Sequence, residues 1–192
     1  MRRGQVRIIG GTWRGRKLTV PEGTAVRPTP DRVRETLFNW LASIVPGAVC
    51  LDLFAGSGAL GLEALSRGAA HLVMVDKSQA VINLLKQECQ LFSAVHVNLC
   101  RATLPKDWSF LTNITCSVFD IVFLDPPYQE DLLLPLCFAL EEKALLANPA
   151  YIYLETDKVI DNSVLPVGWD LLKSKKAGQV GYYLAKRFVP AI

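Results

Sequence analysis

Apolar runs of strand length alternate with helix-length segments from Ala48 onward, and this alternation restricts the fold more than any other feature of the sequence. The segments 59–67, 78–91 and 130–146 are long enough for helices, whereas 103–115 is less regular. Strands that are apolar on both faces need cover on both faces, and intervening helices join parallel strands, so the pattern predicts a doubly wound α/β fold. The five expected strands are AVCLDLF (48–54), HLVMVD (71–76), AVHVNLC (94–100), FDIVFLD (119–125) and AYIYLE (150–155).

A small hairpin is expected at each end of the chain. The tail WDLLKSKKAGQVGYYLAKRFV is typical of two strands around Gly178, which would close one edge of a mostly parallel, seven-stranded sheet. Near the start, residues 5–20 form a second, separate hairpin, and residues 21–30 are rich in turn formers. We therefore expect a basic hairpin and linker, 1–28, and a main domain, 29–192. The hairpin residues are Gly10, Gly11 and Gly15 in turns and Ile8, Ile9, Leu18 and Val20 in strands.

The main domain is expected to begin with a helix. Thr29 is a suitable N-cap, Pro30 suits the first turn, and apolar residues recur at helical spacing from Val33. Arg34 lies on this helix with Arg32 and Glu35. These charged residues form either a surface ion network or a contact to a nucleic acid.

Composition favours an ordered globular protein outside the membrane. The chain is 51% hydrophobic and 20% charged, and its longest dense apolar run, LLLPLCFAL, is interrupted by Pro135. Met1, Arg2 and Arg3 are not followed by the apolar core of a signal peptide. The five cysteines are widely spaced without a C-x-x-C pair, so we expect reduced thiols in a cytoplasm and no metal site.

Positive charge is concentrated near the start of the chain. Residues 1–40 hold nine Lys or Arg and three acids. A second cluster lies near the end, without an intervening acid. Such segregation is typical of a polyanion-binding surface, although a solvated basic face explains it equally well. The second cluster is Lys173, Lys175, Lys176, Lys186 and Arg187.

A glycine-rich turn within VCLDLFAGSGALG (49–61) is the first candidate for chemistry. Gly56, Gly58 and Gly61 have the G-x-G-x-x-G spacing between an expected strand and helix, and Asp76 follows about twenty residues later, where an acid can hold a ribose. This arrangement fits NAD sites, S-adenosylmethionine sites and a turn without a ligand. Asp52 favours S-adenosylmethionine, because it would repel a pyrophosphate but attract the ammonium of a methionine moiety. Alternatively, Asp52 caps a neighbouring turn.

The turn after the fourth strand, Asp125-Pro126-Pro127-Tyr128, supplies the second candidate. The prolines restrict the backbone, so the turn can present the Asp125 carboxylate and the carbonyl of Pro126 as two fixed acceptors. An exocyclic base amine has two hydrogens to donate, and fixed acceptors would aim its lone pair at a methyl carbon. Tyr128 could stack on an extruded base. The turn therefore indicates methyl transfer to an amino group, without a metal.

Several stretches resemble known methyltransferases. LDLFAGSGALGLEALSRGA resembles motif I of class I methyltransferases, VMVDKS their ribose-binding strand, and DPPY motif IV of enzymes that act on base amines. RIIGGTWRGRKL, RPTPDRVRETLFNWL and KAGQVGYYL extend the resemblance to the RsmD family over nearly the whole chain. The resemblance implies a Rossmann-like fold, S-adenosylmethionine as cofactor, and methylation of guanine N2 (guanine 966) in bacterial 16S rRNA.

The resemblance also assigns roles to residues of this chain. It places Asp125 at the centre of catalysis, with Pro126, Pro127 and Tyr128 around the base. Many class I methyltransferases place an acid or amide after the third strand to accept from the adenine amine, and Arg101 departs from that pattern because arginine only donates. Backbone groups near Arg101 and Ala102, or another side chain, would then contact the adenine. The remaining cofactor residues are Thr29, Asp52, Phe54, Ala55, Gly56, Gly58, Leu60, Asp76 and Lys77.

The expected partner is 16S rRNA in the small ribosomal subunit or its assembly intermediate, bound by a monomer. Trp13 either stacks on RNA or packs against the main domain. The alternatives are a DNA or RNA adenine-N6 methyltransferase, an NAD-dependent oxidoreductase and a non-catalytic RNA-binding assembly factor. The expected RNA contacts are Arg7, Trp13, Arg14, Arg16, Lys17 and Arg27.

Overall fold

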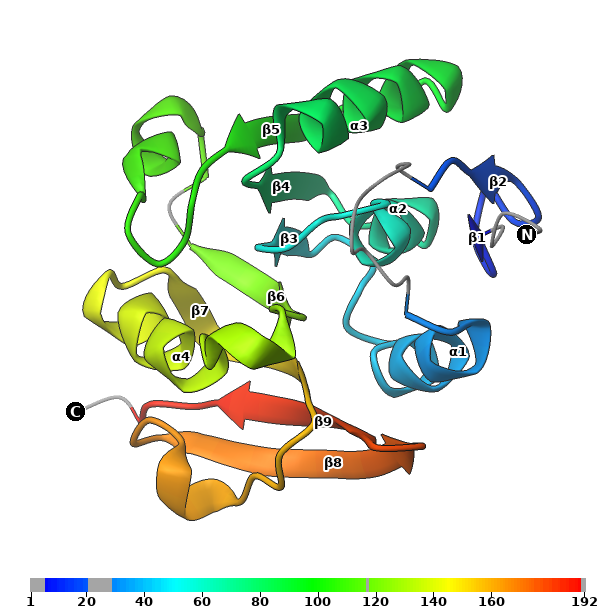
Figure 1. The fold of residues 1–192 in the computed structure, drawn as a ribbon. Coiled ribbons are helices and arrows are strands. Elements are labelled where there is room, and N and C mark those ends of the chain that lie inside the picture. The colour runs from blue at the N-terminus through cyan, green and yellow to red at the C-terminus, as the bar shows by residue number, and fades with distance from the viewer. Residues whose placement is uncertain (1–5, 21–28, 117, 191–192) are drawn as a thin grey trace.

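A computed structural model describes residues 6–20, 29–116 and 118–190 (Figure 1). Its main sheet has seven strands in the order β5-β4-β3-β6-β7-β9-β8, and β1 and β2 form a separate two-stranded sheet. The elements are β1 (Val6–Arg7), β2 (Lys17–Leu18), α1 (Asp31–Trp40), β3 (Val49–Asp52), α2 (Ala59–Ser66), β4 (His71–Asp76), α3 (Gln79–Leu91), β5 (Val97–Arg101), η1 (Ser109–Asn113), β6 (Phe119–Leu124), η2 (Tyr128–Glu130), α4 (Leu133–Glu142), β7 (Leu146–Thr156), η3 (Asn162–Val164), β8 (Trp169–Ala177) and β9 (Val180–Arg187).

The sheet confirms the predicted doubly wound α/β fold. Strands β3 to β7 pair in parallel, and the tail hairpin β8–β9 adds two strands by antiparallel pairing of β9 with β7. The chain reverses direction in the sheet order at β3, which lies between β4 and β6. In open α/β sheets, ligands bind at the carboxyl ends of strands beside such a switch point.

Helices cover both faces of the sheet, as Figure 1 shows. Leu37 of α1, Leu62 of α2 and Leu85 of α3 belong to one buried cluster with the hairpin residue Ile8. Leu136 of α4 and Phe110 of η1 belong to a second cluster on the opposite face. The central strands β3, β4, β6 and β7 therefore bury side chains on both faces, which explains their apolar sequences.

The N-terminal hairpin is shorter than predicted. Its strands comprise two residues each, and Ile8, Ile9 and Val20 lie outside them. Beyond β1 the backbone docks on α2 instead, since the amides of Ile9 and Gly10 donate to Glu63 at 2.7 and 2.8 Å. Gly11 lies so close to this helix that a Cβ there would be 1.7 Å from the carbonyl oxygen of Ser66. The glycine is therefore required for docking as well as for the turn.

Two further expectations concern the membrane and the cysteines. In the part of the chain that the structure describes, no helix is long and apolar enough to cross a membrane. All five cysteines are free, and Cys50, Cys89 and Cys137 are buried among apolar side chains.

Candidate active site

Four acidic residues gather where parallel strands end. Asp52 ends β3, Asp76 ends β4, Asp125 follows β6, and Glu155 lies one residue before the end of β7. The register pairs Asp52 with Phe123, two residues before Asp125. The glycine-rich turn and the DPPY turn therefore lie at one edge of the sheet, on neighbouring strands.

The glycine-rich turn has a backbone that only glycine adopts readily. Gly56 and Gly58 have φ values of 51° and 76°, and Gly58 is the N-cap of α2. Gly61 has a different role, because a Cβ there would lie 3.1 Å from Leu72 and from the sulfur of Met74. Ala55 donates to the Val75 carbonyl at 2.9 Å, and the buried Leu60 packs in the adjoining core. The turn is thus fixed to the sheet, with the half-buried Phe54 beside it.

Asp52 is buried directly beneath this turn. Its carboxylate accepts from the amides of Phe54 and Gly61 at 3.4 and 3.2 Å, so it caps the turn. Burial, with a smaller contribution from the charge of Asp76, raises the pKa of Asp52 to about 7. None of the salt bridges among the described residues includes Asp52. A cationic ligand group would compensate this carboxylate.

The pH dependence of stability should change when Asp52 is replaced by Asn. Between an unfolded pKa of 3.8 and a folded pKa of about 7, the folded protein retains a proton that the unfolded chain has released. The proton on Asp52 therefore contributes fully to the free energy of unfolding below the unfolded pKa. This contribution is lost as pH rises toward 7, by about 1.4 kcal/mol per pH unit. Between about pH 4 and pH 8, the free energy of unfolding measured in urea should fall less for Asp52→Asn than for the natural protein. Equal declines would contradict this assignment.

Asp76 holds the next strand end in place. Its two oxygens accept from the amides of Gly56 at 3.1 Å and Ser78 at 2.8 Å. The amide of Ala102 donates to the Asp76 carbonyl at 3.1 Å, so the Ala102 N–H is already engaged. Lys77 pairs with Glu130, and Arg101 donates to the Lys77 carbonyl at 3.3 Å. Both cations thus have partners on the protein surface.

The DPPY turn is fixed by a buried carboxylate on β7. Glu155 accepts from the hydroxyls of Tyr128 and Tyr153 at 2.7 and 2.6 Å. Burial and this carboxylate raise the pKa of Tyr128, which remains a phenol. Pro126 is buried and Pro127 is exposed. The tyrosine therefore has a defined position beside Asp125.

Asp125 itself is a half-buried acid in a negative environment. Burial raises its pKa well above the usual range, with further contributions from the charges of Glu155 and Asp52. The hydroxyl of Thr29 donates to Asp125 Oδ2 at 3.4 Å and opposes this rise. Thr29 was expected as the helix N-cap, and that expectation is wrong. Pro30 occupies the cap position, and the Thr29 hydroxyl instead donates to Asp125 at the carboxyl end of β6.

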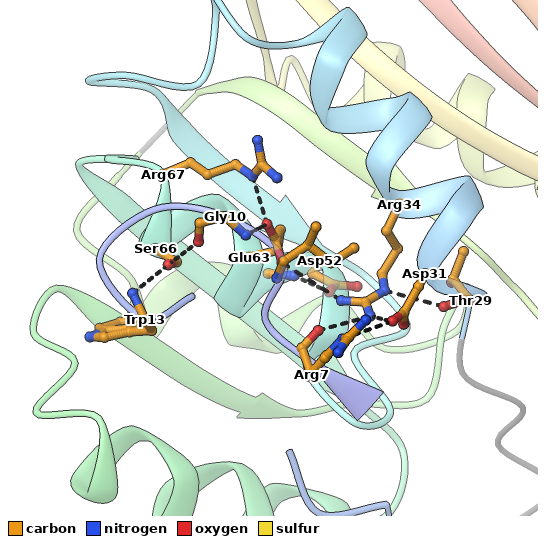
Figure 2. Close-up of polar contacts among 12 residues, drawn as sticks. Arg7, Gly10, Trp13, Thr29, Asp31, Arg34, Asp52, Glu63, Ser66 and Arg67 are labelled. Carbon is orange, nitrogen blue, oxygen red and sulfur yellow. Dashed lines mark hydrogen bonds and ion pairs between the residues drawn. The ribbon is translucent and has the colours of Figure 1, made fainter. Parts of the chain in front are cut away.

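A buried ion network connects Thr29 and helices α1 and α2 to the hairpin (Figure 2). Arg34 is fully buried and lies 3.7 Å from Glu63 and 2.7 Å from Asp31. The expectation that Arg34 lies on the surface, or contacts RNA, is therefore wrong. Glu63 is also fully buried and pairs with Arg67 at 2.6 Å. The helix positions that carry these charges face the hairpin, so the hairpin completes their burial.

The hairpin residues proposed for RNA differ in their environments. Trp13 is half-buried with its ring 5.2 Å from that of Phe92, so it packs against the main domain. Arg16 lies over the same ring and donates to the Leu91 carbonyl at 2.6 Å. Arg7 is exposed and pairs with Asp31 at 3.3 Å. Arg14 and Lys17 are exposed, and Arg27 lies outside the described residues.

Sequence comparison places the chain in a family. A family model described as "Conserved hypothetical protein 95" matches residues 6–186. "Ribosomal RNA small subunit methyltransferase D" of Escherichia coli (strain K12) is 46% identical over 184 residues, 96% of this chain and 91% of that protein. The protein of the same name in Haemophilus influenzae is 42% identical, covering 95% of this chain and 94% of its own. The chain belongs to the RsmD family.

Solved structures agree with membership of the RsmD family. The structure of yhhF from Escherichia coli has a TM-score of 0.84 and 45% identity, covering 97% of this chain and 100% of that one. SMU.776, solved in complex with SAH, has a TM-score of 0.67 and 16% identity, covering 88% of this chain and 53% of that one. At 16% identity the second likeness shows the fold alone.

Two residues of the site were missed by sequence reasoning. Glu155 ends an apolar strand in the same way as Asp52 and Asp125, and this shared position could have identified it. Glu63 interrupts the apolar face of ALGLEALS, where a buried acid needs a partner. Its partner Arg34 is distant in sequence, so only the fold reveals the pair.

Proposed function

We propose that this chain transfers a methyl group from S-adenosylmethionine to the N2 amine of a guanine in 16S rRNA. Support comes from the RsmD-family relatives, which are named as ribosomal RNA small subunit methyltransferases. The observation that carries the proposal is the position of Asp125, on the strand beside the glycine-rich turn and at the same sheet edge. Guanine 966, a bacterial cytoplasm and a monomeric enzyme belong to the same proposal.

The residues of this edge suit S-adenosylmethionine. Asp52 is a buried carboxylate whose raised pKa would return toward its usual range beside the methionine ammonium. The turn around Gly56 and Gly58, with Phe54, Ala55 and Leu60, would lie along the methionine, and Asp76 would accept from the ribose. Lys77, Arg101 and Ala102 would border the adenine. When bound, the cofactor supplies an electrophilic methyl group on a sulfonium.

Asp125 and the Pro126 carbonyl would then hold the guanine amine by its two hydrogens. An aromatic amine is a weak nucleophile, because its lone pair is delocalised into the ring. Two fixed acceptors favour a pyramidal nitrogen and stabilise the positive charge that develops on it. The ionised form of Asp125 is the better acceptor. As the product forms, the methylated nitrogen releases one proton, which Asp125 accepts and then passes to solvent. Tyr128, held by Glu155, would flank the base.

Basic residues of β8 lie level with the carboxyl ends of the parallel strands, where they could contact the phosphates of an RNA backbone. The register pairs Tyr182 of β9 with both Glu155 of β7 and Lys175 of β8, so Lys175 is level with the acidic edge. Two strand spacings separate β7 from β8, about 10 Å. Lys173 and Lys176 are also exposed on this outer strand and, with Lys175, line a groove beside residues 159–163. Arg14 and Lys17 would contact RNA from the hairpin, and residues 1–28 would act as the RNA-binding extension of the domain 29–192.

Labelled S-adenosylmethionine and small subunits that lack this modification should test the proposal. We expect label in N2-methylguanine of 16S rRNA after digestion to nucleosides. Label in N6-methyladenine would instead support the adenine-N6 alternative. The absence of label, with retained subunit binding, would favour a non-catalytic assembly factor. Binding of NAD in place of S-adenosylmethionine would support an oxidoreductase, which the acid beneath the glycine turn disfavours.

A further inference from the structure

Arg34 and Glu63 are the two fully buried charged residues of the described chain, and one contact of Arg34 leads toward Asp125. The Arg34 side chain is 0% exposed. Nε donates to the Thr29 carbonyl at 3.2 Å, and Nη2 donates to the Arg7 carbonyl at 2.9 Å and to Asp31 at 2.7 Å. Nη1 faces Glu63 at 3.7 Å and has no hydrogen-bond partner among the described residues. One guanidinium thus joins β1, α1, α2 and the segment before α1 (Figure 2).

Thr29 carries this connection to the proposed catalytic acid. Its carbonyl is held by Arg34, while its buried hydroxyl donates to Asp125 at 3.4 Å. The titratable groups near Asp125 are Glu155 on β7, Asp52 on β3 and the phenol of Tyr128 on η2. None of these groups brings positive charge. The Thr29 hydroxyl is therefore the side-chain donor that favours an ionised, oriented Asp125.

We propose that Arg34 is a positioning residue for methyl transfer, because it fixes Thr29 so that the Thr29 hydroxyl orients Asp125. The inference deepens the proposed function and rests on it. Arg34 acts through geometry, since Asp31 and Glu63 already balance its charge close by. The Arg7 carbonyl makes the hairpin part of the same assembly, so the docked hairpin supports the orientation of Asp125.

Carboxyl titration of Asp125 by NMR in the cofactor-free protein provides a test that needs no substrate. Thr29→Val removes the donor and should raise the pKa of Asp125, whereas Thr29→Ser keeps the hydroxyl and should preserve it. Arg34→Lys retains one charge but lacks the planar fork that reaches several acceptors at once. It should raise the pKa of Asp125 in the same direction. Thr36→Val, on the same helix with its hydroxyl bonded to the Arg32 carbonyl, is the matched control.

Kinetics should show that the two residues act in series. Thr29→Val should lower kcat about tenfold, the usual scale for a hydrogen bond to a charged group, and move the acidic limb of the pH profile to higher pH. The KM for S-adenosylmethionine should stay unchanged, because the Thr29 hydroxyl is engaged with Asp125; the expectation that Thr29 binds the cofactor predicts a higher KM instead. The double variant Arg34→Lys with Thr29→Val should lose no more activity than the more impaired single variant, because both remove one interaction.

Several outcomes would overturn the inference. One is an unchanged Asp125 pKa in Thr29→Val. Another is a multiplied loss in the double variant, and a third is a higher KM for S-adenosylmethionine with an unshifted pH limb. If Arg34→Lys does not fold, Asp31→Asn loosens the guanidinium at its half-exposed partner and should still raise the Asp125 pKa. No methylation by the natural protein would instead count against the proposed function and leave the titration result intact.

Discussion

Asp125→Asn should bind S-adenosylmethionine normally and lose roughly 100- to 1,000-fold in kcat, the loss typical when one fixed polar group is removed from a transition state. The substitution keeps the size of the side chain but replaces an anionic acceptor with a neutral amide. Asp125 is half-buried and has no salt bridge among the described residues, so replacing its carboxylate should leave folding intact. Calorimetric titration of the cofactor and single-turnover methylation of subunits would measure the two effects separately.

Asp120→Asn is a suitable control. Asp120 lies near the start of β6, the strand that leads to Asp125, and its carboxylate accepts from the Val49 amide far from the carboxyl end of the strand. The variant should retain most of the activity. Near-natural turnover by Asp125→Asn would remove the DPPY carboxylate from the mechanism. A loss of cofactor binding as large as the loss of kcat would instead assign Asp125 to the cofactor.

Glu63→Ala should destabilise the folded protein by about 3–5 kcal/mol, since it leaves the buried Arg34 charge without its buried partner. It also removes the acceptor of the Ile9 and Gly10 amides and of Arg67. Urea unfolding would measure the loss. Amide exchange at Ile9 and Gly10 should accelerate more than exchange in the central strands, because the hairpin loses its dock on α2.

Glu142→Ala supplies the comparison for this stability measurement. Glu142 is exposed at the end of α4, and its replacement should change stability by less than about 0.5 kcal/mol. Similar unfolding curves for the two variants would show that the Arg34–Glu63 pair contributes little. Unchanged exchange at the hairpin amides would show that other contacts hold the hairpin.

The sequence predicted elements wherever local signals were strong. β4 was predicted with both ends correct, and α3 within one residue, because Ser78 caps that helix and accepts from the Val81 amide. β7 was predicted from residue 150 but begins at Leu146, since Pro149 disguised its start. The register between β6 and β7 shifts at this point, and such an irregularity accommodates a proline within a strand.

Contacts between distant segments explain what could not be predicted. The hydroxyl of Thr29 bonds a residue 96 positions away, so its local pattern as a helix cap was misleading. Arg34 looks like a surface residue of an amphipathic helix until the hairpin covers it, and the partners of Glu63 come from segments distant in sequence. The placement of Asp52, Asp76 and Asp125 followed from the fold class alone, because parallel strands end at one edge. Their roles toward ligands stay predictions.

Helix α2 has eight residues and serves two structures at once. Its first turn follows the glycine-rich segment, while Glu63 and Ser66 farther along accept hydrogen bonds from backbone amides of the hairpin. With about 1.5 Å of rise and 100° of rotation per residue, the number of residues between these points sets both their separation and their relative direction. An insertion or deletion within α2 would therefore both shift and rotate the residues that hold the hairpin relative to the glycine-rich turn.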